Sequence, residues 1–279
     1  MTTLVVSPHL DDAVLSLPGC IRSRALSGER VVVLTVFSEG DAGHATRRAE
    51  DRAALALLGA APLHFGLQDA PQRRGVAPSF RELVLSELAD DDIDAATVTD
   101  ALTLAIAATD ASEILLPLGV GEHVDHRIVH AAHTRLAGPL GFYEDRPYAR
   151  VEHAVTARLL RLGATVDGAA LTPSSAAVEE FLAAARLAPY VRAHLPAAER
   201  EACLRAHAAV LAGTSAASGL ELRRERLSFP RDVCRVATQA IEAYASQLAD
   251  LFGDGAVAAW FAEPYAEHIL WRRAAGVPA

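Results

Sequence analysis

The 279-residue chain contains no lysine and no asparagine, so all 26 of its basic residues are arginines. Without lysine the chain cannot form a Schiff base, anchor pyridoxal phosphate, build a Ser–Lys dyad or supply the lysine of a Walker A loop. Cysteine is also scarce: Cys20, Cys203 and Cys234 lie far apart and form no C-x-x-C pair. They are typical of small buried side chains in a reducing compartment, and a cysteine-based zinc site is not expected.

Long apolar runs and basic stripes are missing as well. No apolar segment approaches the ~20 residues that a membrane span requires, and the N-terminus lacks the pattern of a signal peptide. We therefore expect a cytoplasmic protein with no membrane span. The formal net charge is −9, and because nucleic-acid binding needs a basic surface, nucleic acid is not an expected partner. With 51% hydrophobic and 22% charged residues, the composition is that of a globular protein.

Short apolar segments alternate with helical patterns through the first half of the chain. This alternation predicts an α/β fold with a Rossmann-like, doubly wound and mostly parallel sheet. Residues 1–150 are expected to form this catalytic core, and residues 151–279 a mainly helical appendage packed on it. Because the appendage could also pack against a second copy of the chain, the sequence is compatible with a homo-oligomer. The expected strands are 3–6, 31–37, 63–65, 114–117 and 141–143. The expected helices are 12–24, 47–58, 80–89, 94–109, 125–136, 176–190, 197–212 and 236–252, with a long loop at 68–78.

A polar cluster follows the first expected strand, in the sequence Ser-Pro-His-Leu-Asp-Asp at residues 7–12. Pro8 ends the strand because it has no N–H to give to a ladder. If a helix begins at Asp12, His9 and Asp12 point the same way and offer two ligands for one cation, with Asp11 as a free carboxylate beside them. The structural alternative is that an aspartate caps the helix and His9 is a loop histidine.

A second polar cluster, His123, Asp125 and His126, follows the fourth expected strand. In a doubly wound sheet the ends of the first and fourth strands are neighbours, so the two clusters should meet. Two histidines and one carboxylate leave one position of a zinc ion open, as catalysis requires, although such a site also admits iron or cobalt. Asp125 could hold the second nitrogen of an imidazole.

The same segment contains a competing pattern. His126 and His130 are four residues apart, a common spacing of metal ligands on a helix. We interpret His130 and His133 instead as solvated positions on an amphipathic helix. Gly119 and Gly121 do not complete a dinucleotide fingerprint and more simply allow the backbone to approach a ligand or metal loop.

The two clusters resemble the PIG-L/LmbE family of zinc-dependent N-deacetylases, which show a His-Pro-Asp-Asp motif and a His-x-Asp-His motif. Supporting similarities occur at 47–50, 58–59, 66–69, 142–148 and 244–248. The resemblance implies a hydrolase that removes an N-acetyl or other N-acyl group from an amino-sugar-like small molecule, for example an N-acetylglucosamine derivative. It implies zinc held by His9, Asp12 and His126; Asp11 as general base; His123 as acid or oxyanion-stabilising group; Asp125 as orienting residue; and Arg47 and Asp69 at the sugar hydroxyls.

Some interpretations stay open beside this one. Arg47 is equally compatible with an exposed helix position, and Asp69 with a turn. Leu10 stands where the family commonly has proline and Ala13 where a glutamate often follows, which could alter metal affinity or substrate range. An amidase for a thiol-sugar conjugate or for a natural-product intermediate with a longer acyl chain is the alternative function. The third is a non-catalytic sugar- or nucleotide-binding module.

Overall fold

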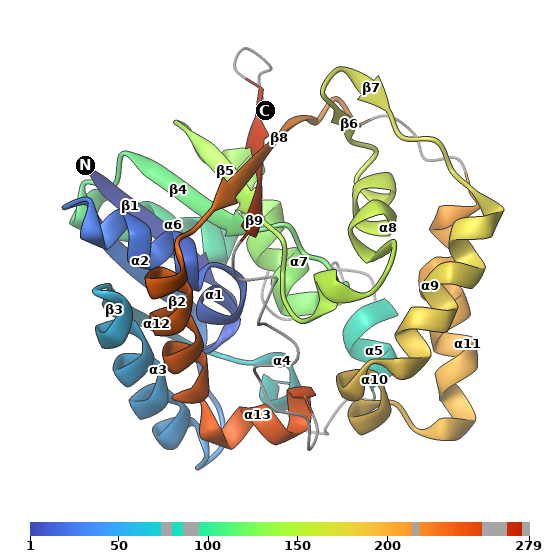
Figure 1. The fold of residues 1–279 in the computed structure, drawn as a ribbon, viewed down its shortest axis with the longest axis horizontal. Helices are drawn as coiled ribbons and strands as arrows, with labels where there is room; N and C mark the ends of the chain where they lie inside the picture. The colour runs from blue at the N-terminus through green and yellow to red at the C-terminus, as the bar shows by residue number, and fades with distance from the viewer. Residues whose placement is uncertain (74–79, 86–94, 214–217, 253–266, 275–279) are drawn as a thin grey trace.

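The computed structural model describes residues 1–73, 80–85, 95–213, 218–252 and 267–274 (Figure 1). Within them a nine-stranded sheet has the strand order β3-β2-β1-β4-β5-β9-β8-β6-β7. Its first five strands are parallel to one another, which confirms the predicted α/β fold with a doubly wound, mostly parallel sheet. They are β1 (Thr2–Ser7), β2 (Arg30–Glu39), β3 (Ala61–Gln68), β4 (Glu113–Pro117) and β5 (Leu140–Tyr143).

Strand β1 lies at the centre of this parallel sheet. Val5 pairs in register with Val33 of β2 on one side and Leu115 of β4 on the other. All three side chains are almost completely buried, as expected of strands covered on both faces. The strand order therefore reverses between β1 and β4. The carboxyl ends of these two strands form the crevice in which open α/β sheets bind ligands.

Helices cover both faces of the sheet (Figure 1). One face carries α1 (Asp12–Ser16), α2 (Pro18–Leu26), α3 (His44–Leu58) and, from the C-terminal part, α12 (Arg231–Glu242). The expected helix 12–24 is broken at Leu17, because Pro18 has no N–H to continue the ladder and starts α2 instead. The other face carries α5 (Phe80–Leu85), α6 (Ala95–Thr109), α7 (Val124–Ala131) and a 3-10 turn at Ala132–Arg135.

The C-terminal part contributes further helices. Figure 1 shows α9 (Ser175–Leu187), α10 (Pro189–His194) and α11 (Ala197–Ala208) grouped together, with α8 (Ala154–Arg161) nearer the sheet. The single helix expected over 236–252 is wrong: α12 ends at Glu242 and α13 (Ala245–Phe252) follows as a separate helix. Tyr244 lies between them, where its buried hydroxyl donates a hydrogen bond to Asp51 Oδ1 over 2.7 Å. None of the described helices is both long and apolar enough to span a membrane.

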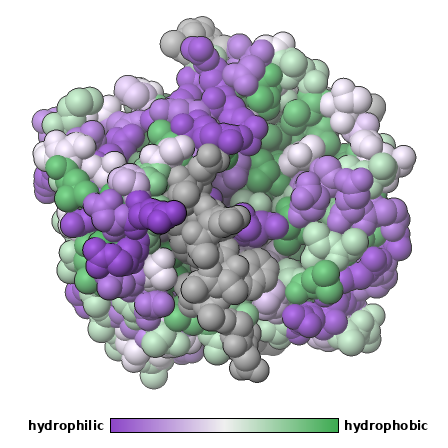
Figure 2. All heavy atoms as spheres, viewed as in Figure 1, coloured by the Kyte–Doolittle hydropathy of each residue, from purple (hydrophilic) through white to green (hydrophobic). Residues whose placement is uncertain are grey.

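Four strands of the C-terminal part extend the sheet, and the sequence does not predict them. They are β6 (Thr165–Val166), β7 (Ala169–Ala170), β8 (Glu221–Ser228) and β9 (Glu267–Arg273). Strand β9 pairs antiparallel with β5, and β8 antiparallel with β9. Figure 2 shows hydrophilic residues gathered over this extension, where Arg223, Arg224 and Arg226 are exposed.

The chain between β3 and β4 was expected to hold a loop at 68–78 and a helix at 80–89. The start of that loop instead forms a short helix, α4 (Ala70–Arg73). The expected helix is present as α5 up to Leu85. The remainder of both segments, 74–79 and 86–89, lies outside the described residues.

Candidate metal centre

The turn after β1 is held by hydrogen bonds that aim His9 and Asp12 at the crevice. Ser7 Oγ donates to the His9 carbonyl (2.6 Å) and accepts from Ala13 N (2.9 Å). Asp12 Oδ2 accepts from His9 N over 2.7 Å and lies 3.1 Å from His9 Nδ1. Asp11 occupies the position before α1, but its side chain makes no capping hydrogen bond. Its carboxylate is therefore available to the crevice.

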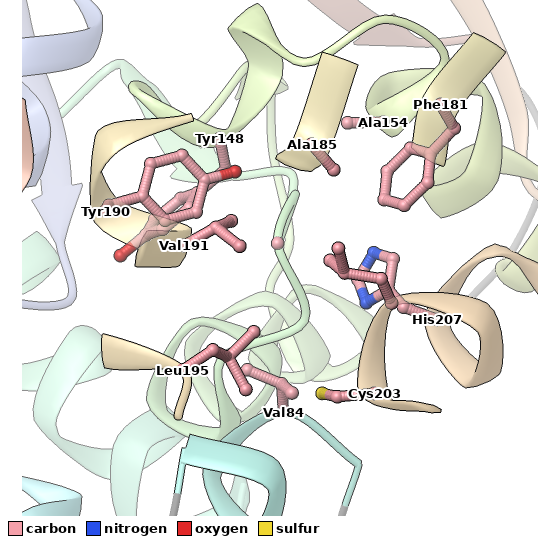
Figure 3. A pocket seen from close by; sticks show the side chains of 12 residues that line it. Val84, Tyr148, Ala154, Phe181, Ala185, Tyr190, Val191, Leu195, Cys203 and His207 are labelled. Carbon is pink, nitrogen blue, oxygen red and sulfur yellow. The ribbon is translucent and has the colours of Figure 1, made fainter. Parts of the chain in front are cut away.

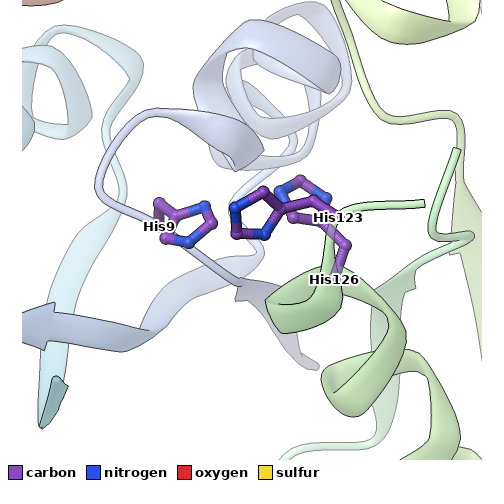
Figure 4. A group of neighbouring side chains, drawn as sticks. All are labelled: His9, His123 and His126. Carbon is purple, nitrogen blue, oxygen red and sulfur yellow. The ribbon is translucent and has the colours of Figure 1, made fainter. Parts of the chain in front are cut away.

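The start of α7 brings the second cluster to the same place. His123 is the N-cap residue of α7, and its Nδ1 accepts a hydrogen bond from Asp125 N at 3.2 Å. Figure 4 shows the rings of His9, His123 and His126 facing one another between the turn after β1 and α7. Their ring centres are 5.0 to 5.6 Å apart, and one nitrogen of each lies within 4.8 Å of the others. The structure thus brings both predicted clusters together.

The donor atoms fit a tetrahedral ion. Ligand atoms about 2.0–2.1 Å from zinc stand about 3.3 Å from each other. Asp12 Oδ2 lies 3.1 Å from His9 Nδ1 and 3.3 Å from His126 Nε2. His126 Nε2 is buried and faces Asp12 Oδ2 at 3.3 Å without the geometry of a hydrogen bond, so a bound cation would satisfy both atoms better. His9, Asp12 and His126 therefore form a suitable ligand set, with a nitrogen of His123 near enough to face a fourth position.

Carboxylates behind the histidines orient their rings. Asp125 Oδ2 lies 2.9 Å from His9 Nε2, which leaves His9 Nδ1 toward Asp12. Asp145 Oδ1 lies 2.7 Å from His126 Nδ1, and its Oδ2 accepts from the backbone N–H groups of Gly119 and Val120 (2.7 and 2.9 Å). Asp145 was not predicted as a site residue. It lies two residues after the end of β5, the neighbour of β4, so its place near the carboxyl end of a strand was the available signal.

The electrostatics of the cluster favour a cation. Burial disfavours charge on His9 and His126, but hydrogen bonds and charges from the surrounding aspartates outweigh it and raise their pKa values to about 10 and about 9. Burial alone would raise the pKa of Asp12, but His126 and His9 hold it well below its usual range. His123 differs, since burial lowers its pKa to about 3 and keeps it neutral. Positive charge is therefore stabilised where His9, Asp12 and His126 meet.

The predicted base and substrate residues surround an open pocket of about 150 Å³ beside these ligands. Arg47 Nη2 lies 4.0 Å from Asp11 Oδ1, and Arg47 Nη1 lies 3.9 Å from Asp69 Oδ2. Burial and the charge of Asp12 raise the pKa of Asp11, against the opposing charge of Arg47. Six of the eight predicted site residues line this pocket: His9, Asp11, Asp12, Arg47, Asp69 and His123. The other two, Asp125 and His126, lie completely buried behind it.

A second, smaller pocket of about 30 Å³ adjoins the first and is mainly apolar (Figure 3). Tyr148 lines both pockets, and its ring lies edge-on to Tyr190 of α10 at 5.0 Å and to His126 at 5.8 Å. The C-terminal helices supply most of the remaining wall, including Phe181 of α9 and His207 of α11. The appendage therefore borders the site, a role that the sequence did not reveal.

Two interpretations of the second cluster need correction. His130 is not solvated: it is 2% exposed, and its Nδ1 lies 3.0 Å from the Pro117 carbonyl, beneath the end of β4. Burial and the nearby charge of Arg158 lower its pKa well below the usual value. Gly119 and Gly121 adopt φ values of +85° and +90°. A Cβ there would meet the side chains of Arg158 and Tyr148, so the glycines make room for protein side chains.

Comparison with known families identifies the part of the chain that carries this site. Residues 4–137 match the profile of the family described as PIG-L, GlcNAc-PI de-N-acetylase. That range contains most of β1, all of β2 to β4 and every predicted site residue. Over this range, a little under half of the chain, the protein is similar to the PIG-L family.

The chain is also similar to a curated protein, the 2'-N-acetylparomamine deacetylase of Streptomyces fradiae. The two sequences are 34% identical over 171 residues, which are 55% of this chain and 60% of the relative. The matched part is thus less than two thirds of the relative's length.

Solved structures agree over nearly the whole chain. A deacetylase–bog complex from the biosynthesis pathway of teicoplanin has a TM-score of 0.63 at 22% identity and covers 99% of this chain and 100% of its own. The zinc-inhibited form of teicoplanin deacetylase has a TM-score of 0.62 at 21% identity, with the same coverage. The C-terminal appendage is therefore part of the shared fold, although it lies outside the PIG-L match.

Proposed function

We propose that this protein is a metal-dependent N-deacetylase that acts on an amino-sugar-like small molecule. The observation that carries the proposal is the convergence of His9, Asp12 and His126 on one point, with the Asp11 carboxylate beside it in an open pocket. The PIG-L match supports deacetylation, and the acetylated aminoglycoside named for the Streptomyces fradiae relative supports an amino-sugar substrate. Zinc is the ion that best suits two histidines and a carboxylate, and other divalent ions remain compatible.

The residues around the ligands have complementary tasks in this proposal. His9, Asp12 and His126 would hold a zinc ion, and that ion would supply the Lewis acidity that makes a water nucleophilic at neutral pH and polarises the amide carbonyl. Asp11 takes the proton of the attacking water, and its raised pKa moves it closer to the range of an effective base. Arg47 and Asp69, which line the same pocket, bind substrate hydroxyl groups.

His123 stabilises the developing oxyanion in this scheme as a neutral donor. Its Nδ1 accepts the N–H of Asp125, so the proton of the neutral ring resides on Nε2. Burial keeps the ring neutral near pH 7. A well-placed donor of this kind contributes about 3 kcal/mol to stabilising the transition state. Asp11, once protonated, is the group that returns a proton to the leaving amine.

A comparison of two variants tests the proposal. With 2'-N-acetylparomamine or N-acetylglucosamine as substrate, the wild-type protein should release acetate. Asp11→Asn should keep its metal and lose about 10²–10⁴-fold in kcat, because only the base is removed. His126→Ala should lose both the metal and the activity. Equal turnover by Asp11→Asn and wild type would remove the base assignment, and absence of acetate release with a loaded metal site would refute the deacetylase.

The apolar second pocket supports a second candidate, an amidase for a somewhat longer acyl chain. Its volume of about 30 Å³ admits only a short apolar extension, since one water-sized sphere already takes about 10–15 Å³. An N-acyl series from acetyl to octanoyl on one amino sugar distinguishes the candidates. A maximum of kcat/KM at acetyl supports the deacetylase, whereas a maximum at a longer chain supports this alternative.

A further inference from the structure

The short helix α4 makes an unexpected contact with the metal side of the site. Asp125 Oδ2 accepts a hydrogen bond from Ala70 N over 2.9 Å, and Asp125 Oδ1 accepts from Arg73 Nη2 over 2.7 Å. Both carboxylate oxygens of Asp125 are thus held by one four-residue helix. The same Oδ2 lies 2.9 Å from His9 Nε2. A chain of contacts therefore runs from α4 through Asp125 to a proposed metal ligand.

The Arg73 side chain is built into the interior. It is 4% exposed, and its Cζ lies 4.9 Å from the centre of the Phe37 ring. The same Phe37 ring lies 6.1 Å from that of His9. Arg73 does not line the pocket beside the ligands, whereas Pro71 and Asp69 of the same segment do. Its guanidinium pairs with Asp125 and also donates to the Gln68 carbonyl (2.9 Å).

We propose that Arg73 is a positioning residue for the metal ligand His9. This inference rests on the proposed metal-dependent function. With one oxygen held by Ala70 N and the other by the guanidinium, the Asp125 carboxylate cannot rotate about its last torsion. Its orientation fixes the His9 ring with Nδ1 toward Asp12. Without Arg73 the carboxylate is free to turn, so His9 is held less precisely and the ion is bound less tightly.

The arrangement also joins the two sides of the site. Asp69, proposed to bind substrate, immediately precedes Ala70, and α4 returns to the metal side within four residues. A carboxylate that orients a metal-bound histidine is a common outer partner, and the loss of such a partner lowers metal affinity by about 10–100-fold. Arg73 contacts this carboxylate and not the histidine itself, so its removal should lower metal affinity by an amount near the lower end of that range.

The test is zinc affinity, measured by competition with a chromophoric chelator. Arg73→Gln should bind zinc about ten-fold more weakly than wild type. Arg73→Lys, which retains a charged donor, should recover part of that loss. The matched control is Arg48→Gln, which removes an arginine that pairs with Glu39 (2.9 Å) and donates to the Ser38 carbonyl, with no hydrogen bond or ion pair to Asp125. Its zinc affinity should equal that of wild type.

A second variant removes the other donor to Asp125. Ala70 is the first residue of α4, where proline is well tolerated, so Ala70→Pro deletes the N–H without breaking the helix. It too should weaken zinc binding, and the visible spectrum of the cobalt-substituted protein should shift in both variants. A role confined to stability would lower the melting temperature of the ion-free protein but leave zinc affinity and the cobalt spectrum unchanged. That result would refute the positioning role of Arg73 but not the proposed function. If the wild-type protein bound no divalent ion, both the positioning role and the metal-dependent function would be refuted.

Discussion

At the scale of single residues, His126 depends on a side chain far from it in the sequence. Asp145 is completely buried and divides its oxygens between the His126 ring and two backbone N–H groups of the loop after β4. It therefore fixes both the ring orientation and the loop that leads to His123. A carboxylate behind a histidine ligand also increases the basicity of the ring and so strengthens metal binding.

Asp145→Asn should lower zinc affinity by about 10–100-fold, because the amide is uncharged and can satisfy only some of these contacts. Chelator competition measures the change. Glu144→Gln is the matched control, since Glu144 accepts from Trp271 Nε1 and not from His126. If both variants bound zinc like wild type, Asp145 would have no part in holding the ion.

The sequence predicted those site residues that lie close together in short motifs. His9 and Asp12, and His123 and His126, lie three apart after strands whose ends meet, so spacing and topology together predict their convergence. Asp145 and Arg73 carry no such pattern. Asp145 lies in an irregular segment after β5 and Arg73 is the last residue of the short helix α4. The partner of each becomes visible only when the chain has folded.

At the scale of elements, the placement of α13 depends on α3. Glu50 accepts hydrogen bonds from Ser246 N and Oγ (2.9 and 2.6 Å), and Asp51 accepts from Tyr244 Oη and also lies 2.8 Å from His64 Nε2. These contacts hold α13 against the site, where Gln247 and Leu251 line the pocket beside the ligands. Hydrogen bonds to the carboxylates of Glu50 and Asp51, outside the pocket, thus hold this part of its wall in place.

Tyr244→Phe should lower the free energy of unfolding by about 1.5–3 kcal/mol, the usual loss for a buried hydrogen bond to a charged group. Urea denaturation followed by circular dichroism measures it. Ser27→Ala, which removes an exposed hydroxyl bonded to the Ser23 carbonyl, should change it by less than about 0.5 kcal/mol. A Tyr244→Phe protein as stable as the control would show that this contact does not secure α13.

Among the elements, buried parallel strands were predictable and the sheet extension was not. The core of β2, residues 31–37, is apolar except for the buried Thr35, which is typical of a strand covered on both faces. Strand β8 reads Glu-Leu-Arg-Arg-Glu-Arg-Leu-Ser and is largely exposed. It is held by pairing with β9 and by ion pairs across strands, such as that of Arg272 with Glu225 at 2.6 Å, which local sequence does not reveal.

At the scale of the whole molecule, burial of histidines links stability to pH. His207 of α11 is 8% exposed and stacks on Phe181 of α9 at 5.4 Å. Burial and the positive charges of nearby arginines, against the opposite effect of Glu122, lower its pKa to about 4 from 6.5. The unfolded chain therefore binds a proton at a higher pH than the folded chain does. This contribution to stability is complete above pH 6.5 and is lost as the pH falls towards 4.

His207→Phe keeps the stacked ring and removes the titration, so it should make unfolding less sensitive to acid. The contribution lost by wild type between pH 7.5 and pH 4 amounts to about 3 kcal/mol from this residue. Unfolding free energies of both proteins across that range measure it, with the values at pH 7.5 as the internal control. Parallel curves for the two proteins would mean that His207 is protonated alike in the folded and unfolded states.

The account as a whole depends on one ion held between the ends of β1 and β4. The most direct measurement is anomalous diffraction at the zinc edge from crystals grown with zinc. It should show one strong peak about 2.0–2.2 Å from His9 Nδ1, the Asp12 carboxylate and His126 Nε2. A fully occupied peak bound by other residues, or no peak among these three, would contradict it.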